Sequence, residues 1–85
     1  MTVRIRYLSA LRDTTRMRME DAVFADGATL KEVSAFLAEK YGIHVPGPSV
    51  MGTVNGRGWS QTSQGAATEL HQGDEIALFP LLSGG

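Results

Sequence analysis

The sequence predicts a small α+β domain, with one main helix packed on one face of a single sheet of four to five strands. Two observations favour this fold class. Segments in which apolar residues recur at every second position, typical of strands, stand before and after one segment with helical spacing. The chain has 85 residues, 42% hydrophobic and 20% charged, which suits one folded domain and excludes two. Because a sheet and a helix each have one apolar side, packing them together buries both.

The N-terminal residues predict the first strand and its hairpin partner. Val3, Ile5 and Tyr7 alternate with outward-facing residues, and Leu8 continues the outward series. Residues 9–15 interrupt the alternation and are expected to be a connection. Apolar residues then indicate a second strand beside the first: Met17, Met19, Val23 and Phe24.

The main helix is expected to begin after Thr29 and to end at Gly42. Thr29 and Glu32 fit a capping box, and Gly42 stands where a left-handed C-terminal cap is favoured. Apolar residues lie along one face at helical spacing: Leu30, Val33, Leu37 and Tyr41, with Phe36 flanking. This stripe is expected to belong to the core, because its spacing is that of a helix packed on a sheet.

Further strands are predicted in the second half of the chain. Residues 50–54 have the pattern of a short strand, followed by Asn55-Gly56, the dipeptide that best tolerates the positive φ angles of a tight hairpin turn. Residues 60–68 are small and polar and predict no long helix. The last strand is expected over residues 75–79, with two different faces: Ile76 and Leu78 on one, Ala77 and Phe79 on the other.

Residues 80–85 are expected to form a flexible C-terminal tail on a folded domain of residues 1–79. Pro80 cannot donate a hydrogen bond to a strand ladder, so it should end the last strand. Gly84-Gly85 has no side chains and is the narrowest polypeptide tip, able to expose its carboxylate inside a tight channel. Such a carboxylate reacts only after activation, for instance as an acyl-adenylate, which would make Gly85 a substrate. The alternative is a frayed chain end.

Few residues offer chemistry of their own. The chain has no cysteine, which removes disulfides, thiolate metal sites and cysteine nucleophiles. His44 and His71 have no second ligand at metal spacing, and the adjacent Asp74 and Glu75 diverge on a strand. No Gly-x-Ser-x-Gly motif or phosphate-binding loop is present. We therefore expect neither a bound cofactor, nor a metal, nor a stand-alone enzyme.

Charge and hydropathy restrict partners and location. The net charge is -1, but residues 1–20 carry five arginines against two acidic residues, or +3. The remaining basic residues are scattered, so we expect no nucleic-acid partner. No apolar run is long enough to cross a membrane, and the N-terminal residues lack a signal-peptide pattern, which together predict a cytoplasmic protein without a membrane partner.

A docking patch is expected on the sheet face away from the helix. Leu8 on the first strand and Phe79 on the last both point to that face, with Trp59 as a third candidate. Converging apolar side chains of this kind, two of them aromatic, are suited to anchor a partner protein beside the tail.

The chain resembles the MoaD/ThiS family of ubiquitin-like sulfur carriers, and more closely the MoaD branch. The residues that carry the resemblance are Val54-Asn55 and the last sixteen, from Leu70 through Gly73-Asp74-Glu75 and Phe79-Pro80 to Gly84-Gly85. The resemblance implies a ubiquitin-like β-grasp fold with a mixed sheet. It also implies that an E1-like adenylating enzyme of the MoeB/ThiF type uses ATP to adenylate Gly85. The product is then converted to a thiocarboxylate that donates sulfur, with Gly84 as the narrow neck.

In the MoaD branch, the carrier is the small subunit of molybdopterin synthase in molybdenum cofactor biosynthesis. The resemblance implies a MoaE-like large subunit that receives the tail, including Pro80, Leu81 and Leu82. Leu8, Trp59 and Phe79 match apolar docking positions of this branch, Trp59 only after a one-residue insertion. Leu81 replaces a second proline that MoaD tails often carry.

Three functions remain open at this point. The first is a sulfur carrier, whose receiving pathway is open because related carriers serve thiamin, cysteine, tRNA thiolation or secondary metabolism. A ubiquitin-like modifier joined to lysines would need the same free glycine end. A purely structural interaction domain would be indifferent to the tail.

Overall fold

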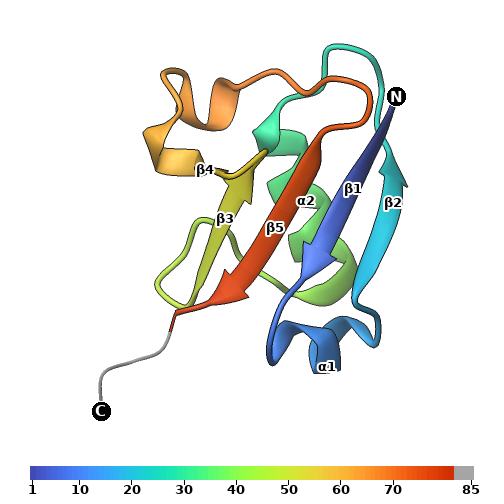
Figure 1. Cartoon of the computed structure of the whole chain (residues 1–85), viewed down its shortest axis with the longest axis vertical. Coiled ribbons are helices and arrows are strands. Elements are labelled where there is room, and N and C mark those ends of the chain that lie inside the picture. Colours follow the sequence, from blue (N-terminus) through green and yellow to red (C-terminus); the bar gives the residue numbers. More distant parts are fainter. Residues whose placement is uncertain (82–85) are drawn as a thin grey trace.

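The computed structural model describes residues 1–81 of the chain. Figure 1 shows a sheet with a helix behind it. The elements follow in this order: β1 (Thr2–Tyr7), α1 (Leu11–Thr15), β2 (Met19–Val23), α2 (Leu30–Tyr41), β3 (Val50–Val54), β4 (Arg57–Gly58), the 3₁₀ turns η1 (Trp59–Gln61) and η2 (Gly65–Ala67), and β5 (Glu75–Pro80).

The five strands form one mixed sheet in the order β2-β1-β5-β3-β4. β1 and β2 form an antiparallel hairpin, whereas β1 and β5 are parallel neighbours and β5 is antiparallel to β3. Helix α2 crosses one face, and the other face is uncovered in the part of the chain that the structure describes (Figure 1). The predicted α+β class, with four to five strands and one main helix on a ubiquitin-like β-grasp plan, is confirmed.

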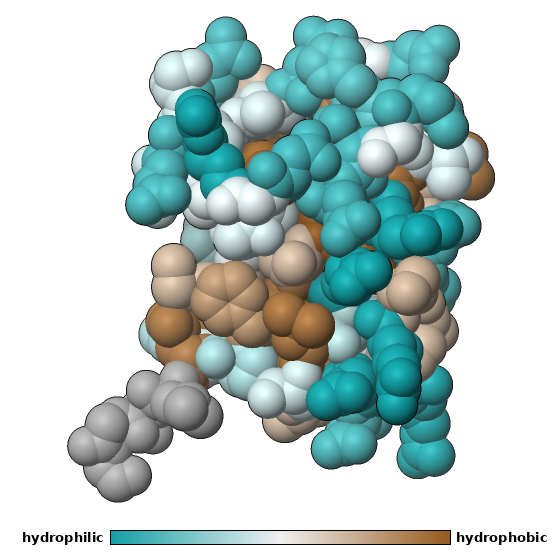
Figure 2. All heavy atoms as spheres, viewed as in Figure 1, coloured by the Kyte–Doolittle hydropathy of each residue, from teal (hydrophilic) through white to brown (hydrophobic). Residues whose placement is uncertain are grey.

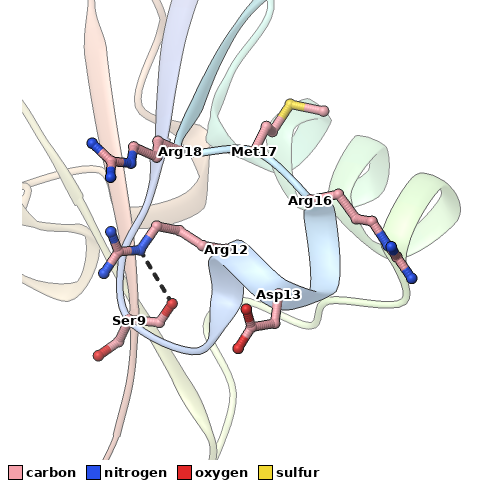
Figure 3. Close-up of a pocket in the computed structure, with 6 residues that line it drawn as sticks. All are labelled: Ser9, Arg12, Asp13, Arg16, Met17 and Arg18. Atoms are coloured by element: carbon pink, nitrogen blue, oxygen red, sulfur yellow. Dashed lines mark hydrogen bonds between the residues drawn. The ribbon is translucent and has the colours of Figure 1, made fainter.

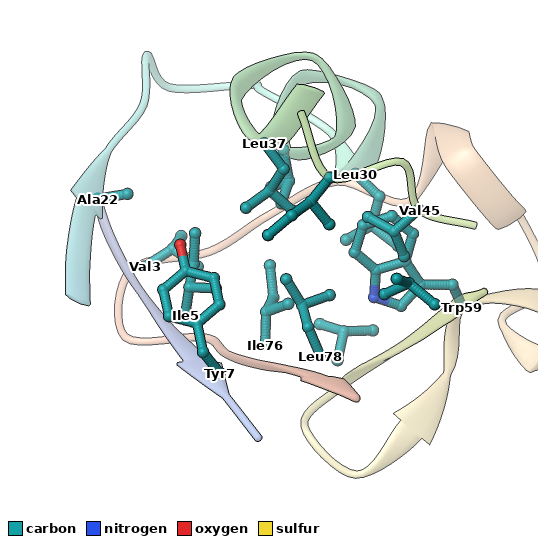
Figure 4. Packing of buried hydrophobic residues seen from close by; sticks show 14 of the residues in the cluster. Val3, Ile5, Tyr7, Ala22, Leu30, Leu37, Val45, Trp59, Ile76 and Leu78 are labelled. Atoms are coloured by element: carbon teal, nitrogen blue, oxygen red, sulfur yellow. The ribbon is translucent and has the colours of Figure 1, made fainter. Parts of the chain in front are cut away.

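The core lies between α2 and the sheet (Figure 4). Strand alternation places the predicted side chains of β1 and β5 toward the helix, where they are fully buried: Val3, Ile5, Tyr7, Ile76 and Leu78. Leu30, Val33 and Leu37 of α2 meet them from the opposite side. Burial of this apolar surface, at about 25 cal/mol per Å², is the main favourable contribution to folding.

Both predicted caps of α2 are present. The Thr29 backbone N–H donates to Glu32 Oε2 over 2.7 Å, which completes the capping box. Hydrogen bonds from Thr29 lower the pKa of the Glu32 carboxyl. Gly42 ends the helix at φ 70°, a left-handed conformation that glycine adopts without strain.

Two segments differ from the sequence prediction in detail. Residues 9–15, expected as a plain connection, contain the short helix α1, whose Leu11 and Thr15 are one turn apart and buried. Residues 60–68 form no long helix, as expected. They contain the last two residues of η1 and the whole of η2. No helix within residues 1–81 is long and apolar enough to cross a membrane.

Trp59 was the third candidate for the docking patch on the uncovered face, and this placement is wrong. Strand β4 ends at Gly58, and the 3₁₀ turn that begins at Trp59 carries the indole to the helix side, where it is only 4% exposed. Figure 4 shows the ring beside Val45 and Leu30. Gly52 leaves the space for it, because a Cβ there would lie 2.8 Å from the ring. Trp59 is therefore a core residue.

Candidate docking surface

Strand β5 positions the start of the C-terminal segment. It lies in the centre of the sheet, between β1 and β3, and Pro80 is its last residue, paired with Val50. Beyond Pro80, the Leu81 backbone N–H donates to the Ser49 carbonyl over 2.9 Å. The chain is thus held to the sheet through Leu81, two residues beyond Phe79.

An apolar patch surrounds this point on the uncovered face. It consists of Leu8, Met51, Phe79 and Leu81. Leu8, Met51 and Leu81 are 41%, 38% and 43% exposed, and Phe79 is half-buried. Met51 and Phe79 are paired across β3 and β5, and the Leu8 N–H bonds to the Leu78 carbonyl. Figure 2 shows brown and tan side chains gathered at the lower end of this face. The outward placement predicted for Leu8 and Phe79 is confirmed.

The other end of the same face is polar, and its arginines are paired with carboxylates. Arg4 pairs with Asp21 over 3.0 Å, and Arg6 pairs with Glu75 over 2.9 Å. The hydrogen bond and charge of Asp21 raise the pKa of the Arg4 guanidinium. The face is therefore divided into a polar half, with its charges compensated, and the apolar half beside Leu81.

Asn55 fastens the start of β5 to the β3–β4 turn. Its Nδ2 donates to Asp74 Oδ1 and its Oδ1 accepts from the Glu75 N–H, both over 3.0 Å, while its own N–H bonds to the Glu75 carbonyl over 2.7 Å. Asn55 has φ 50°, as the turn requires. Asp74 also accepts the His71 N–H through its second oxygen over 2.8 Å. Asn55 and the Asp74-Glu75 segment, which are distant in sequence, therefore meet in one hydrogen-bond network that fixes the start of β5.

Glu20 joins the edge of the sheet to the end of α2. Its carboxylate accepts hydrogen bonds from the Tyr7 and Tyr41 hydroxyls and from Lys40, the last over 3.2 Å. Burial opposes ionisation of Glu20, but these three donors outweigh it and lower the pKa of the carboxyl. Burial and Glu20 raise the pKa of both tyrosines. No local sequence signal reveals this cluster, because the three donors lie 13 to 21 residues from Glu20 in the sequence.

Within residues 1–81, no group of three or more His, Cys, Asp or Glu side chains could hold a metal ion. The carboxylates near β5 are engaged in turn and strand contacts, as the Asp74 and Glu75 bonds show. What the described residues offer is a surface for docking, centred on the end of β5.

The sequence profile of the ThiS family matches residues 5–85. The chain belongs to the ThiS family. This family comprises ubiquitin-like sulfur carriers. Comparison with curated proteins gives no significant sequence match.

Solved structures share the fold of this ThiS-family chain. The HVO 2177 protein of Haloferax volcanii is 27% identical, with a TM-score of 0.81 over 100% of this chain and 87% of that protein. SAMP1 from Haloferax volcanii is 19% identical, with a TM-score of 0.77 over 100% of both chains. A Pyrococcus furiosus protein described as molybdopterin converting factor, subunit 1, is 20% identical, with a TM-score of 0.77 over 95% of this chain and 98% of that one. SAMP1 and the Pyrococcus furiosus protein are only 19% and 20% identical to this chain, so the likeness to them establishes the fold alone.

The structure brings together only part of the site expected for a ThiS-family carrier. Leu8, Phe79 and Leu81 lie in the apolar patch, with Pro80 at the end of β5 beside it. Met51 was not predicted, although its outward position follows from the inward Val50 and Gly52 on either side. Trp59 lies in the core. The predictions for Leu82, Gly84 and Gly85 fall outside the described residues.

Proposed function

We propose that this protein is a sulfur carrier whose Gly85 carboxylate is adenylated and then converted to a thiocarboxylate, acting as the small subunit of molybdopterin synthase. The observation that carries the proposal is the position of the apolar patch, which lies at Leu81, the last point within residues 1–81 at which the chain is hydrogen-bonded beside the sheet. A partner docked on the patch would be within reach of the four residues that follow. Four residues span at most about 14 Å.

The chemistry requires a partner. In the proposed sequence, a Gly85 carboxylate oxygen attacks the α-phosphate of ATP and pyrophosphate leaves, which gives an acyl-adenylate. A sulfur nucleophile then displaces AMP, and the carrier ends as a thiocarboxylate. The chain has no cysteine to supply sulfur and no phosphate-binding loop for ATP. An E1-like adenylating enzyme of the MoeB/ThiF type therefore binds ATP and delivers the sulfur.

Family membership and the surface support this role. The apolar patch suits docking onto the adenylating enzyme and onto a MoaE-like large subunit in turn, because both must take the same tail. A fold shared with a protein described as a molybdopterin converting factor subunit favours the MoaD branch. Leu8 and Phe79 support the docking half of the proposal, whereas the buried Trp59 does not.

The alternative is a protein modifier joined to lysines. The fold shared with SAMP1, a small archaeal modifier protein, favours it. A modifier and a sulfur carrier use the same activated glycine and differ in the nucleophile that displaces AMP. A carrier serving another sulfur-requiring pathway is the second alternative.

The test is mass spectrometry of the intact protein after incubation with an E1-like adenylating enzyme from the same organism, ATP and a sulfur donor. We expect a gain of about 16 Da on the C-terminal peptide, since sulfur replaces one carboxylate oxygen. The gain should be absent without ATP and absent when one residue is added after Gly85. Oxidation of the methionines also adds about 16 Da, so peptide mapping is needed. Lysine-linked adducts without a thiocarboxylate would establish the modifier instead.

A further inference from the structure

The arginines of the N-terminal region fall into two groups. Arg4 and Arg6 are paired with carboxylates on the sheet. Arg12, Arg16 and Arg18 have no carboxylate within ion-pair distance among residues 1–81. Asp13 of α1 lines the same cavity and offsets one of these three charges, which leaves a local excess of positive charge around α1, although the chain as a whole has a net charge of -1.

These three arginines line an open cavity of about 770 Å³ beside α1. In Figure 3, the guanidinium groups of Arg12 and Arg18 point to the same side, whereas that of Arg16 points the other way. The three groups therefore do not converge on one point, as they would around a single small anion. Arg12 and Arg18 instead form a pair, which we call the arginine rim.

The arginine rim is continuous with the apolar patch. A smaller cavity, of about 200 Å³, is lined by Arg12 and Arg18 together with Leu8 of the patch. Both arginines are exposed, and Leu8 is 41% exposed. One surface thus joins apolar anchors at the end of β5 to two exposed guanidinium groups that have no carboxylate partner within residues 1–81, although Arg12 Nε donates to the Ser9 carbonyl over 3.4 Å.

We propose that the arginine rim binds carboxylates on the E1-like adenylating enzyme, and that this contact accelerates docking of the carrier onto that enzyme. The inference rests on the proposed function, since it concerns the partner at the same surface. Guanidinium groups bind carboxylates in a bidentate geometry, and charges at the border of an interface mainly increase the association rate. A partner that is acidic around its apolar docking groove matches this surface.

A nucleic acid is the less suitable occupant. A phosphate backbone is followed by basic residues along a groove, and backbone contacts need no apolar anchors. Here the two guanidinium groups border exposed apolar side chains, and the nearby Arg6 is already paired with Glu75.

The experiment measures the association rate of the full-length protein with the E1-like adenylating enzyme as ionic strength increases. The test variant is Arg12→Glu with Arg18→Glu. The control, Lys31→Glu with Arg57→Glu, makes the same change in net charge at two exposed residues, at the start of α2 and on β4. Circular dichroism melting verifies that each variant is folded.

We expect the test variant to associate on the order of tenfold more slowly at low salt, and the control within about twofold of wild type. The difference should shrink at high salt, and Arg12→Lys with Arg18→Lys should retain most of the rate. The salt dependence of the wild-type rate gives a second measurement that needs no variant. If the test and control variants associate at equal rates while wild type still gains about 16 Da, the proposed role of the arginine rim is overturned and the proposed carrier function is not.

Two further outcomes are informative. If wild type forms neither an adenylate nor a thiocarboxylate, the proposed function fails and the rim proposal fails with it. A fluorescent single-stranded oligonucleotide is tested in parallel, and we expect no saturable binding at about 0.15 M salt. Oligonucleotide binding that is lost in the test variant would overturn the assignment to an acidic protein.

Discussion

Met51 and Phe79 lie directly opposite each other on β3 and β5, and both side chains emerge on the uncovered face of the sheet. Opposed side chains on antiparallel strands are close enough to contact each other. The pair therefore forms one apolar anchor next to Leu81, and its position is set by strand register rather than by a loop.

Phe79→Ala should weaken binding to the tail-receiving partner by about 2 kcal/mol or more, the loss typical of an aromatic anchor. Its effect on folding should be smaller, because Phe79 is half-buried and faces away from the helix. The comparison is Leu37→Ala, a fully buried residue of α2 whose truncation should cost about 2 to 5 kcal/mol. Binding is measured by calorimetry and stability by urea unfolding. Equal destabilisation by both changes would show that Phe79 acts in folding.

Deletion of Gly84-Gly85 should abolish function and leave the melting temperature nearly unchanged. The last described element ends at Pro80, and the last described hydrogen bond beside the sheet is made by Leu81. Chain termini beyond such contacts contribute little to stability. Complementation in cells measures function, and thermal melting measures stability. A truncated protein that still supports the pathway would rule out both the carrier and the modifier.

Gly52→Ala should destabilise the fold by about 1 to 3 kcal/mol, the usual cost of overpacking a core. The added Cβ would lie 2.8 Å from the buried indole of Trp59 and 3.1 Å from Leu78. Both neighbours are buried in the core, so either would have to disturb its own packing in order to move away. Thr53→Ala on the opposite face of β3 is the control, with an expected change of about 0.5 kcal/mol or less. Urea unfolding compares the two, and a Gly52→Ala protein as stable as the control would contradict the packing described for Trp59.

Glu20→Gln should destabilise the protein at neutral pH by about 1 to 3 kcal/mol, because three donors would lose their charged acceptor. The folded-state pKa of Glu20 is lowered, so its charge stabilises the fold above the unfolded value of about 4.3. That contribution disappears as the pH falls through the folded-state pKa. The difference in unfolding free energy between wild type and variant should therefore narrow below about pH 4.

Glu39→Gln, at an exposed position of the same helix, is the control for this titration. We expect it to change stability by about 0.5 kcal/mol or less at every pH. A Glu20→Gln difference that stays constant from neutral to acid pH would mean that the network does not depend on the carboxylate charge.

Most of the fold could be predicted because its signals are local. The alternation of Val3, Ile5 and Tyr7 and the cap at Thr29 each specify one element from its own residues. Trp59 was misplaced because its direction depends on where β4 ends, and the cavity that receives it is left by Gly52 on another strand.

The docking surface needed register and tertiary contacts that no single segment contains. Leu8 and Phe79 could be assigned to the uncovered face from alternation alone. The pairing of Phe79 with Met51 and the attachment of Leu81 to Ser49 depend on how β3 aligns with β5. The arginine rim likewise depends on tertiary contacts, because only the structure shows that Arg4 and Arg6 are paired with carboxylates whereas Arg12 and Arg18 are not.

The central position of β5 has a consequence for synthesis of the protein. β5 follows the other four described strands in the sequence, yet it joins β1 on one side to β3 on the other. Before residues 75–80 emerge, the β1–β2 hairpin and the β3–β4 hairpin have no strand between them. A nascent chain that has not reached residue 75 therefore lacks the completed sheet. Because Phe79 and Leu81 belong to β5 or follow it directly, the docking surface is assembled only after that strand has been synthesised.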